Sequence, residues 1–271
     1  EAFASRVAES EELTAFLVVL PLPKQQPNLL LAAVKFLLGT ARDADEFERW
    51  VGDHADSIRA EMLRRRTQTN EPGRCATLLP VLAGLPEPLA LLEVGAAAGL
   101  CLLPDRYAYN YERARVLPAD ADRAAAPVFP CVANEATPLP SRMPTVVWRR
   151  GLDLNPLDVS NPEDVKWLEA LVWPGHEGRL ERLAAAIRIA REFPPPVSRG
   201  DLLTDLESVL VGIPPNATPV VFHSAVLAYL PPDDRKKFAR LVRELDAVWI
   251  SNEAPGVFPD IDALAGPDIP R

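Results

Sequence analysis

The residues best suited to chemistry follow short apolar stretches of the chain. They are Glu93 and Gly95, Asp153, Asp201, His223 and Ser224, and Glu253. Four of these seven carry carboxyl groups, each after a different stretch. In an open parallel sheet the carboxyl ends of the strands share one edge, and ligands bind there. An acidic edge suits a ligand with hydroxyl groups and a cationic centre, and it disfavours a pyrophosphate.

The apolar stretches predict the strands that position these residues. We expect strands near 89–94, 145–150, 196–199, 218–222 and 247–251, separated by amphipathic helices. The stretch LALLEVG (89–95) is too apolar to have a solvated face, so it should be the central strand, covered by helices on both sides. Strands that alternate with helices predict an α/β fold with a mostly parallel sheet.

Residues 1–88 predict a helical N-terminal segment. Asn28 fits the N-cap of one helix and Gly39 its end, and residues 45–66 carry apolar side chains at helical spacing. The sequence PEP at 86–88 then marks a boundary. We therefore expect two parts, 1–88 and 89–271.

The composition disfavours several function classes. The chain has 271 residues, a formal charge of −9 and 48% hydrophobic residues, as in an ordinary soluble globular protein. Its only dense basic cluster is Arg64, Arg65 and Arg66, which we expect on a solvated helix face, so we expect no nucleic-acid partner. No stretch reaches the ~20 uninterrupted apolar residues of a membrane span, so we expect no membrane partner.

Cysteines and histidines add little chemistry of their own. Cys75, Cys101 and Cys131 lack C-x-x-C spacing, and we expect all three as small buried residues of a cytoplasmic protein. His54 and His176 are expected at the surface. With His223 they show no metal-ligand spacing, so we expect no metal site.

The turn after the central stretch has a distinctive spacing. Glu93, Gly95 and Gly99 form E-x-G-x-x-x-G, with the small Ala97 between them, and this differs from the G-x-G-x-x-G of dinucleotide-binding turns. It resembles the first motif of S-adenosylmethionine-dependent methyltransferases. In that family the glycine turn passes under the methionine and ribose of the cofactor. The alternative is a turn that only joins a strand to a helix.

Three later segments resemble further methyltransferase motifs in the family's order. GLDLNP (151–156) resembles the second, which implies that Asp153 accepts hydrogen bonds from the ribose hydroxyls. GDL (200–202) resembles the third, which implies that Asp201 faces the adenine amino group. In PVVFHSAVLAYL (219–230), His223 and Ser224 would end a strand beside the cofactor. His223 is the only nearby candidate for a catalytic base.

One spacing departs from the usual pattern. The second acidic residue normally lies ≈ 20 residues after the glycine turn, whereas Asp153 lies 60 residues after Glu93 (153 − 93). An insertion rich in Tyr and Pro must fill the gap. Asp120 or Asp122 could instead end the second strand.

The polar segment TQTNEPGR (67–74) lies between two expected helices. Asn70 is either an N-cap or, with Glu71 and Arg74, part of a substrate-binding surface. Tyr107 is a further substrate candidate, although Tyr107, Tyr109 and Tyr111 also fit a packing role in the insertion.

A closer resemblance covers nearly the whole chain. TQTNEPGR, EVGAAAGL, WRRGLDLNPLDV and PVVFHSAVLAYL resemble a bacterial family catalogued as a domain of unknown function. That family continues into a final hairpin, so the last strands of the sheet are expected to be missing here. The combined resemblances imply a methyltransferase-like Rossmann fold that binds S-adenosylmethionine and acts on a small molecule. The alternative is a non-catalytic or regulatory protein of the same fold.

Overall fold

The computed structural model describes residues 2–119 and 126–259. It divides into two compact units. The first, here the helical unit, contains the chain up to Thr69 together with Asp158–Ala184. The second, here the sheet unit, contains Asn70–Leu157 and the chain from Ala185 onward. The expected boundary at residue 88 therefore differs from the observed division, because 70–88 belong with the sheet and 158–184 with the N-terminal helices.

The helical unit is built around one apolar helix. Its helices are α1 (Ala2–Glu9), α2 (Glu11–Val18), the short 3-10 helix η1 (Leu22–Lys24), α3 (Pro27–Leu38), α4 (Ala44–Asp53), α5 (Ala55–Arg64) and α7 (Pro162–Ala170), followed by the start of α8 (Glu177–Glu192). Helix α3 buries seven of its 12 residues, as a helix surrounded by others must. It begins at Pro27 rather than after Asn28 and ends at Gly39, as expected. The helix expected over 45–66 is broken into α4 and α5 at His54.

Arg65 ties α7 to the other helices of the helical unit. Its guanidinium carbon lies 4.4 Å from the ring centre of Phe36 and 5.0 Å from that of Trp167, and its Nε donates to Glu61. Such cation–π contacts strengthen when they are shielded from water. The expectation that Arg65 sits on a solvated face is wrong, since only 7% of it is exposed, although Arg64 and Arg66 are exposed.

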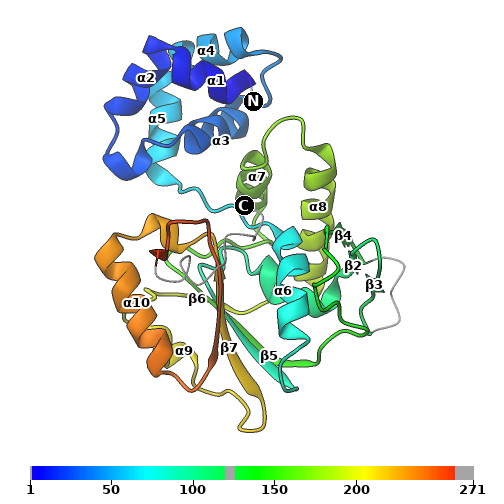
Figure 1. Ribbon diagram of the computed structural model, residues 1–271. Coiled ribbons are helices and arrows are strands. Elements are labelled where there is room, and N and C mark those ends of the chain that lie inside the picture. The colour runs from blue at the N-terminus through cyan, green and yellow to red at the C-terminus, as the bar shows by residue number, and fades with distance from the viewer. Residues whose placement is uncertain (1, 120–125, 260–271) are drawn as a thin grey trace. The chain divides into compact units, whose positions relative to one another are not determined.

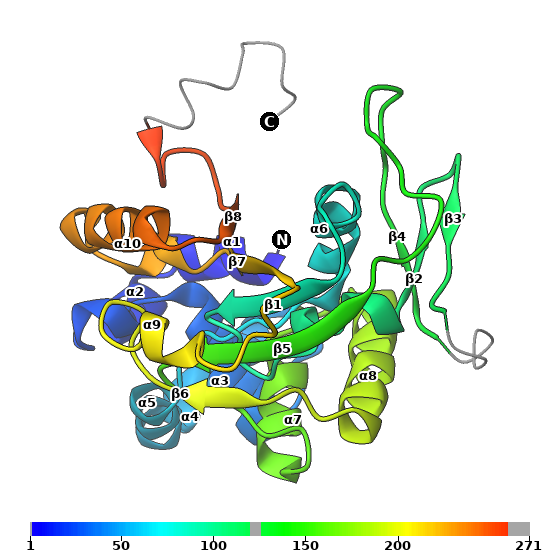
Figure 2. The ribbon, with the colours of Figure 1, turned by 90° about the horizontal axis from the view of Figure 1, so that it is seen from below.

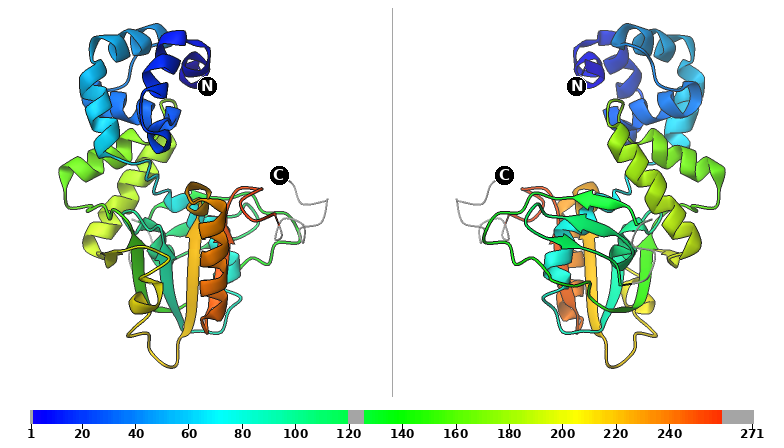
Figure 3. Two further views of the ribbon diagram at one scale, coloured as in Figure 1. Left: turned by 90° about the vertical axis from the view of Figure 1, so that its left-hand side faces the viewer. Right: turned by 90° about the vertical axis from the view of Figure 1, so that its right-hand side faces the viewer.

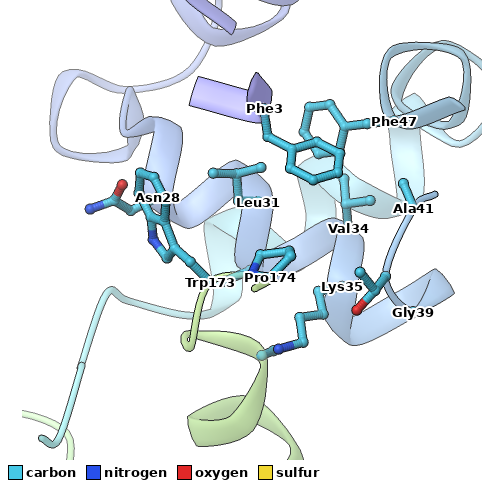
Figure 4. Close-up of a pocket in the computed structure, with 13 residues that line it drawn as sticks. Phe3, Asn28, Leu31, Val34, Lys35, Gly39, Ala41, Phe47, Trp173 and Pro174 are labelled. Atoms are coloured by element: carbon cyan, nitrogen blue, oxygen red, sulfur yellow. The ribbon is translucent and has the colours of Figure 1, made fainter. Parts of the chain in front are cut away.

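Lys35 supplies a second tie to α7. Its Nζ donates to the carbonyl oxygens of Glu169 (2.8 Å) and Val172 (2.7 Å), which lie at the C-terminal end of that helix. Figure 4 shows the side chain extending from α3 toward that segment. Carbonyl groups at a helix C-terminus lack partners within the helix, so a cation there is stabilising.

The sheet unit contains a parallel five-stranded sheet in the order β6-β5-β1-β7-β8. The strands are β1 (Leu89–Val94), β5 (Val146–Asp153), β6 (Val197–Arg199), β7 (Thr218–Ser224) and β8 (Val248–Asn252), and every neighbouring pair is parallel. All six residues of β1 are buried. The predicted α/β class, the five strands and the central place of the Glu93 strand are confirmed.

Helices cover both faces of this sheet. Leu92, Val94 and Val221 pack on one face with Phe238 and Val242. The last two belong to α10 (Pro232–Glu244), which lies on the same side as α9 (Leu206–Val209), whereas α6 (Cys75–Leu82) lies on the other (Figure 1). Both views of Figure 3 show α10 in orange alongside β7 in yellow.

The insertion between β1 and β5 forms a small sheet of its own. Its strands are β2 (Ala108–Asn110), β3 (Arg115–Val116) and β4 (Val128–Pro130), in the order β3-β2-β4. Figure 2 shows them on the side of the sheet unit away from α10. Tyr107, Tyr109 and Tyr111 are at most 1% exposed, so all three pack the insertion.

The insertion explains the long gap between Glu93 and Asp153. Because β5 pairs with β1, Asp153 ends the strand next to the central one. Asp120 and Asp122 lie outside the described residues.

Candidate ligand site at the carboxyl edge of the sheet

The sheet has one point at which its chain order reverses. From β1 the chain proceeds to β5 and β6 on one side, and then returns to β7 and β8 on the other. Ligands of open parallel sheets bind outside the carboxyl ends of the strands at such a point. The predicted residues from β1, β5, β6 and β7 all lie at or just beyond this end of the strands, which we call the carboxyl edge.

The glycine turn begins immediately after β1. Gly95 and Gly99 have φ angles of +72° and +71°, which favour glycine, and Ala97 has φ +49°, which costs a side-chain-bearing residue about 1–2 kcal/mol. The N–H of Gly95 donates to the carbonyl of Leu152 at 2.7 Å. Strain of this kind gathers at functional sites, and here it lies at the reversal point.

The turn is tightly covered by the protein itself. A Cβ placed on Gly95 would collide with Cγ2 of Val226 and lie 2.8 Å from its Cγ1. A Cβ on Gly99 would lie 2.8 Å from Cγ of Pro195. A side chain at Gly95 would therefore have no open space to enter, and replacing Gly95 would disturb packing whether or not a ligand binds.

Asp153 holds the turn in place. Its Oδ2 accepts from the N–H of Ala97 at 2.8 Å and its Oδ1 from the N–H of Asn155 at 2.7 Å. The carboxylate thus points toward the glycine turn, and its ribose-binding role stays a prediction. Asp201 lies two residues beyond β6, is half-buried, and accepts from the N–H of Leu203 at 2.8 Å.

Asn70 and Tyr107 anchor the far end of the turn. Asn70 is 6% exposed and its Oδ1 accepts from the N–H of Leu100 at 2.9 Å, while the Tyr107 hydroxyl donates to the Leu100 carbonyl at 2.8 Å. Asn70 is not an N-cap. That role belongs to Glu71, whose Oε1 accepts from the N–H of Gly73 at the start of η2 (Pro72–Arg74).

Glu93 and Arg74 lie at the same edge. Glu93 is 3% exposed, and its Oε2 has no hydrogen-bond partner within the described residues. Burial, and next the adjacent Cys101, raise the pKa of this carboxyl well above its usual range, although Arg74 opposes the rise. Arg74 Nη1 donates to the carbonyl of Ser224, the last residue of β7, at 2.8 Å.

His223 is fully buried between two partners. The Trp249 Nε1–H can only donate, so His223 Nε2 is its acceptor at 2.9 Å, and Nδ1 carries the proton donated to Glu253 Oε1 at 2.7 Å. Both ring nitrogens are thus engaged, and the catalytic role of His223 stays a prediction. Trp249 carries no signal in the sequence that would have placed it here.

Glu253 ties the loop after β7 to this pair. Its Oε1 also accepts from the N–H groups of Val226 (3.0 Å) and Leu227 (3.2 Å). Burial opposes ionisation, but the hydrogen bonds from His223 and this backbone outweigh it and hold the pKa of Glu253 below its usual value. Its other oxygen, Oε2, is buried without a partner among the residues the structure describes.

The remaining expectations concern solvent exposure, metals and membranes. His54 and His176 are exposed, as predicted, and Cys75 and Cys101 are buried, but Cys131 is only half-buried. Within 2–119 and 126–259 no three potential ligands gather around a metal position, and no helix is long and apolar enough to cross a bilayer. The cavity of Figure 4, in the helical unit, leaves about 20 Å³, room for about one water molecule.

These features define an α/β protein with a parallel sheet and a polar carboxyl edge. The chain matches, over residues 1–266, the model of a family described as uncharacterized proteins conserved in bacteria (DUF2332), and it belongs to that family. No match to the chain was found among curated proteins or among solved structures.

Proposed function

We propose that this protein binds S-adenosylmethionine at the carboxyl edge and transfers its methyl group to a small molecule. The observation that carries the proposal is the glycine turn after the central strand, held at Ala97 by the carboxylate that ends the neighbouring strand. Numbered along the chain, the sheet strands have the order 3-2-1-4-5, which agrees with the first five strands of the doubly wound order.

The edge residues fit the proposed cofactor in chemical type. A carboxylate offers about four acceptor positions, so Asp153 can hold the turn and also accept from ribose hydroxyls. Asp201 would face the adenine amino group. Gly95, Ala97 and Gly99 would lie under the methionine and ribose, with Ser224 beside them. S-adenosylmethionine, when bound, supplies an electrophilic methyl group, and the protein's part is to align an acceptor with it.

Calorimetric titration of the full chain with S-adenosylmethionine tests the proposal. We expect saturable binding that Asp153→Asn weakens at least tenfold, because the amide has fewer acceptor positions for ribose. Asp246→Asn makes the same chemical change at an exposed site of the sheet unit and should leave the affinity unchanged. Wild-type protein that shows no binding at millimolar S-adenosylmethionine would refute the proposal.

A non-catalytic binding protein is the second candidate. The engagement of both ring nitrogens of His223 favours it, because the only proposed base is then not accessible. Production of S-adenosylhomocysteine in the presence of a bacterial small-molecule extract separates the two candidates. Binding without any such product would favour the second.

A further inference from the structure

Arg74 and Glu93 lie near each other at the carboxyl edge of the sheet. Glu93 pairs in register with Phe222, so its side chain is on the face to which Phe222 and Ser224 contribute, opposite to that of His223. Arg74 comes from η2, directly before α6, and reaches the end of β7 through the Ser224 carbonyl. The guanidinium is close enough to influence the ionisation of Glu93.

Within the described residues, neither group uses all of its hydrogen-bonding capacity. Glu93 is almost completely buried, yet one of its two oxygens makes no hydrogen bond in the described part of the chain. The guanidinium of Arg74 has five N–H groups, but the one hydrogen bond found for it there is to Ser224, and no carboxylate pairs with it. A buried polar group is rarely left unpaired, so the free oxygen of Glu93 favours a further partner, and the half-buried Arg74 has N–H groups left to bind the same partner.

The two groups together select the chemistry of that partner. Burial raises the pKa of the Glu93 carboxyl well above its usual range and so favours the neutral acid, whose O–H donates a hydrogen bond. The Arg74 guanidinium also donates hydrogen bonds, so both groups bind a hydrogen-bond acceptor. A carboxylate matches the planar fork of a guanidinium and can also accept from a neutral acid. An ammonium group would pair with Glu93 but would be repelled by Arg74.

We infer that Arg74 and Glu93 form a subsite for the carboxylate of a bound small molecule. The inference rests on the proposed function in assigning that molecule to the ligand site at this edge. Two molecules could bring the carboxylate: the methyl acceptor, as an organic acid, or S-adenosylmethionine through its amino-acid end.

Two matched pairs of probes distinguish these sources by calorimetry on the full chain. The first pair is S-adenosylmethionine and decarboxylated S-adenosylmethionine, and the second is benzoate and benzamide. In at least one pair the carboxylate compound should bind at least tenfold more tightly. A preference in the first pair identifies the cofactor as the source, and a preference in the second identifies the acceptor.

Variants then assign the preference to the subsite. Arg74→Gln should abolish it, whereas Arg240→Gln, at an exposed position of the same unit, should keep it. Should Arg74→Gln fail to fold, Glu93 gives the answer: Glu93→Leu should abolish the preference and Glu93→Gln, whose amide still donates, should restore it. Absence of a preference in both pairs overturns the inference, as does a preference that survives in the folded Arg74→Gln protein or, where that protein does not fold, in Glu93→Leu.

The same titrations separate this inference from the proposed function. Failure of S-adenosylmethionine to bind, together with an Arg74-dependent preference for benzoate, removes the proposed cofactor and retains the subsite. Equal binding of both cofactor forms, without a preference for benzoate, retains the cofactor and removes the subsite.

Discussion

The helical unit and the carboxyl edge of the sheet unit differ in whether their charged side chains have hydrogen-bond partners. In the helical unit Lys35 donates to two carbonyls and Arg65 to Glu61, and no described buried side-chain nitrogen or oxygen there lacks a partner. At the edge, Glu93 and Glu253 each leave one buried carboxyl oxygen unpaired. Proteins rarely leave such groups unpaired without a reason. The difference supports the proposal that the edge binds a ligand.

The largest effect is expected where the helical unit depends on a paired buried charge. Arg65→Ala removes the stacking on Phe36 and Trp167 and leaves the buried Glu61 with Arg64 alone, so we expect a loss of about 3 kcal/mol in the free energy of unfolding. Urea unfolding measures it. Arg66→Ala, at the exposed neighbour, should change stability by no more than about 0.5 kcal/mol. Equal effects of the two changes would show that Arg65 is not a structural tie.

The two edge carboxyls should respond to pH with opposite signs. The raised pKa of Glu93 means that its contribution to stability is full below pH 4.5, its ordinary value, and is lost as pH rises through the raised one. The lowered pKa of Glu253 gives a contribution that is present above pH 4.5 and is lost as pH falls through the lowered value. Each tenfold change in proton affinity changes stability by about 1.4 kcal/mol.

Glutamine variants separate the contributions of Glu93 and Glu253 to stability. Relative to wild type, Glu93→Gln should become more stable as pH rises from 4 to 8, and Glu253→Gln should become more stable as pH falls below 4.5. Thermal unfolding at a series of pH values measures both. Parallel curves for wild type and Glu93→Gln would mean that Glu93 has an ordinary pKa, which would remove one support of the carboxylate subsite.

Sequence patterns were sufficient for the sheet but not for the packing around its edge. The apolar run of β1 and the alternation of strands with helices predicted a central strand, and parallel strands necessarily bring Glu93, Asp153 and Asp201 to one edge. Local composition says nothing about which distant side chain covers a turn. The packing of Val226 over Gly95 is therefore seen only in the structure.

The helical unit shows the same limit. In the sequence, Arg65 is one member of a basic triplet. Its burial depends on contact with Trp167, about a hundred residues later in the chain, which the sequence pattern does not indicate. The observed division of the chain differs from the boundary expected at residue 88 for a related reason. A segment late in the chain, with an ordinary helical pattern, joins the N-terminal helices through tertiary contacts alone.

The smallest effect concerns backbone strain, which also differs between the two units. The described non-glycine residues with positive φ are Ala97, Glu112 and Ala225, all in the sheet unit. Ala97 lies within the glycine turn, and Ala225 directly follows the end of β7. Glycine relieves this strain but increases the entropy of the unfolded chain, so Ala97→Gly, Ala225→Gly and Glu112→Gly should each raise stability by about 0.5 kcal/mol or less.

If the strain at the edge orders the ligand site, the two alanine variants should also weaken S-adenosylmethionine binding about threefold. Glu112→Gly is the matched control, because Glu112 lies in the turn of the small sheet between β2 and β3 and should leave binding unchanged. Thermal unfolding beside calorimetry on the three variants measures both quantities. Unchanged affinity in both alanine variants would show that the positive φ angles at the edge serve only to turn the chain.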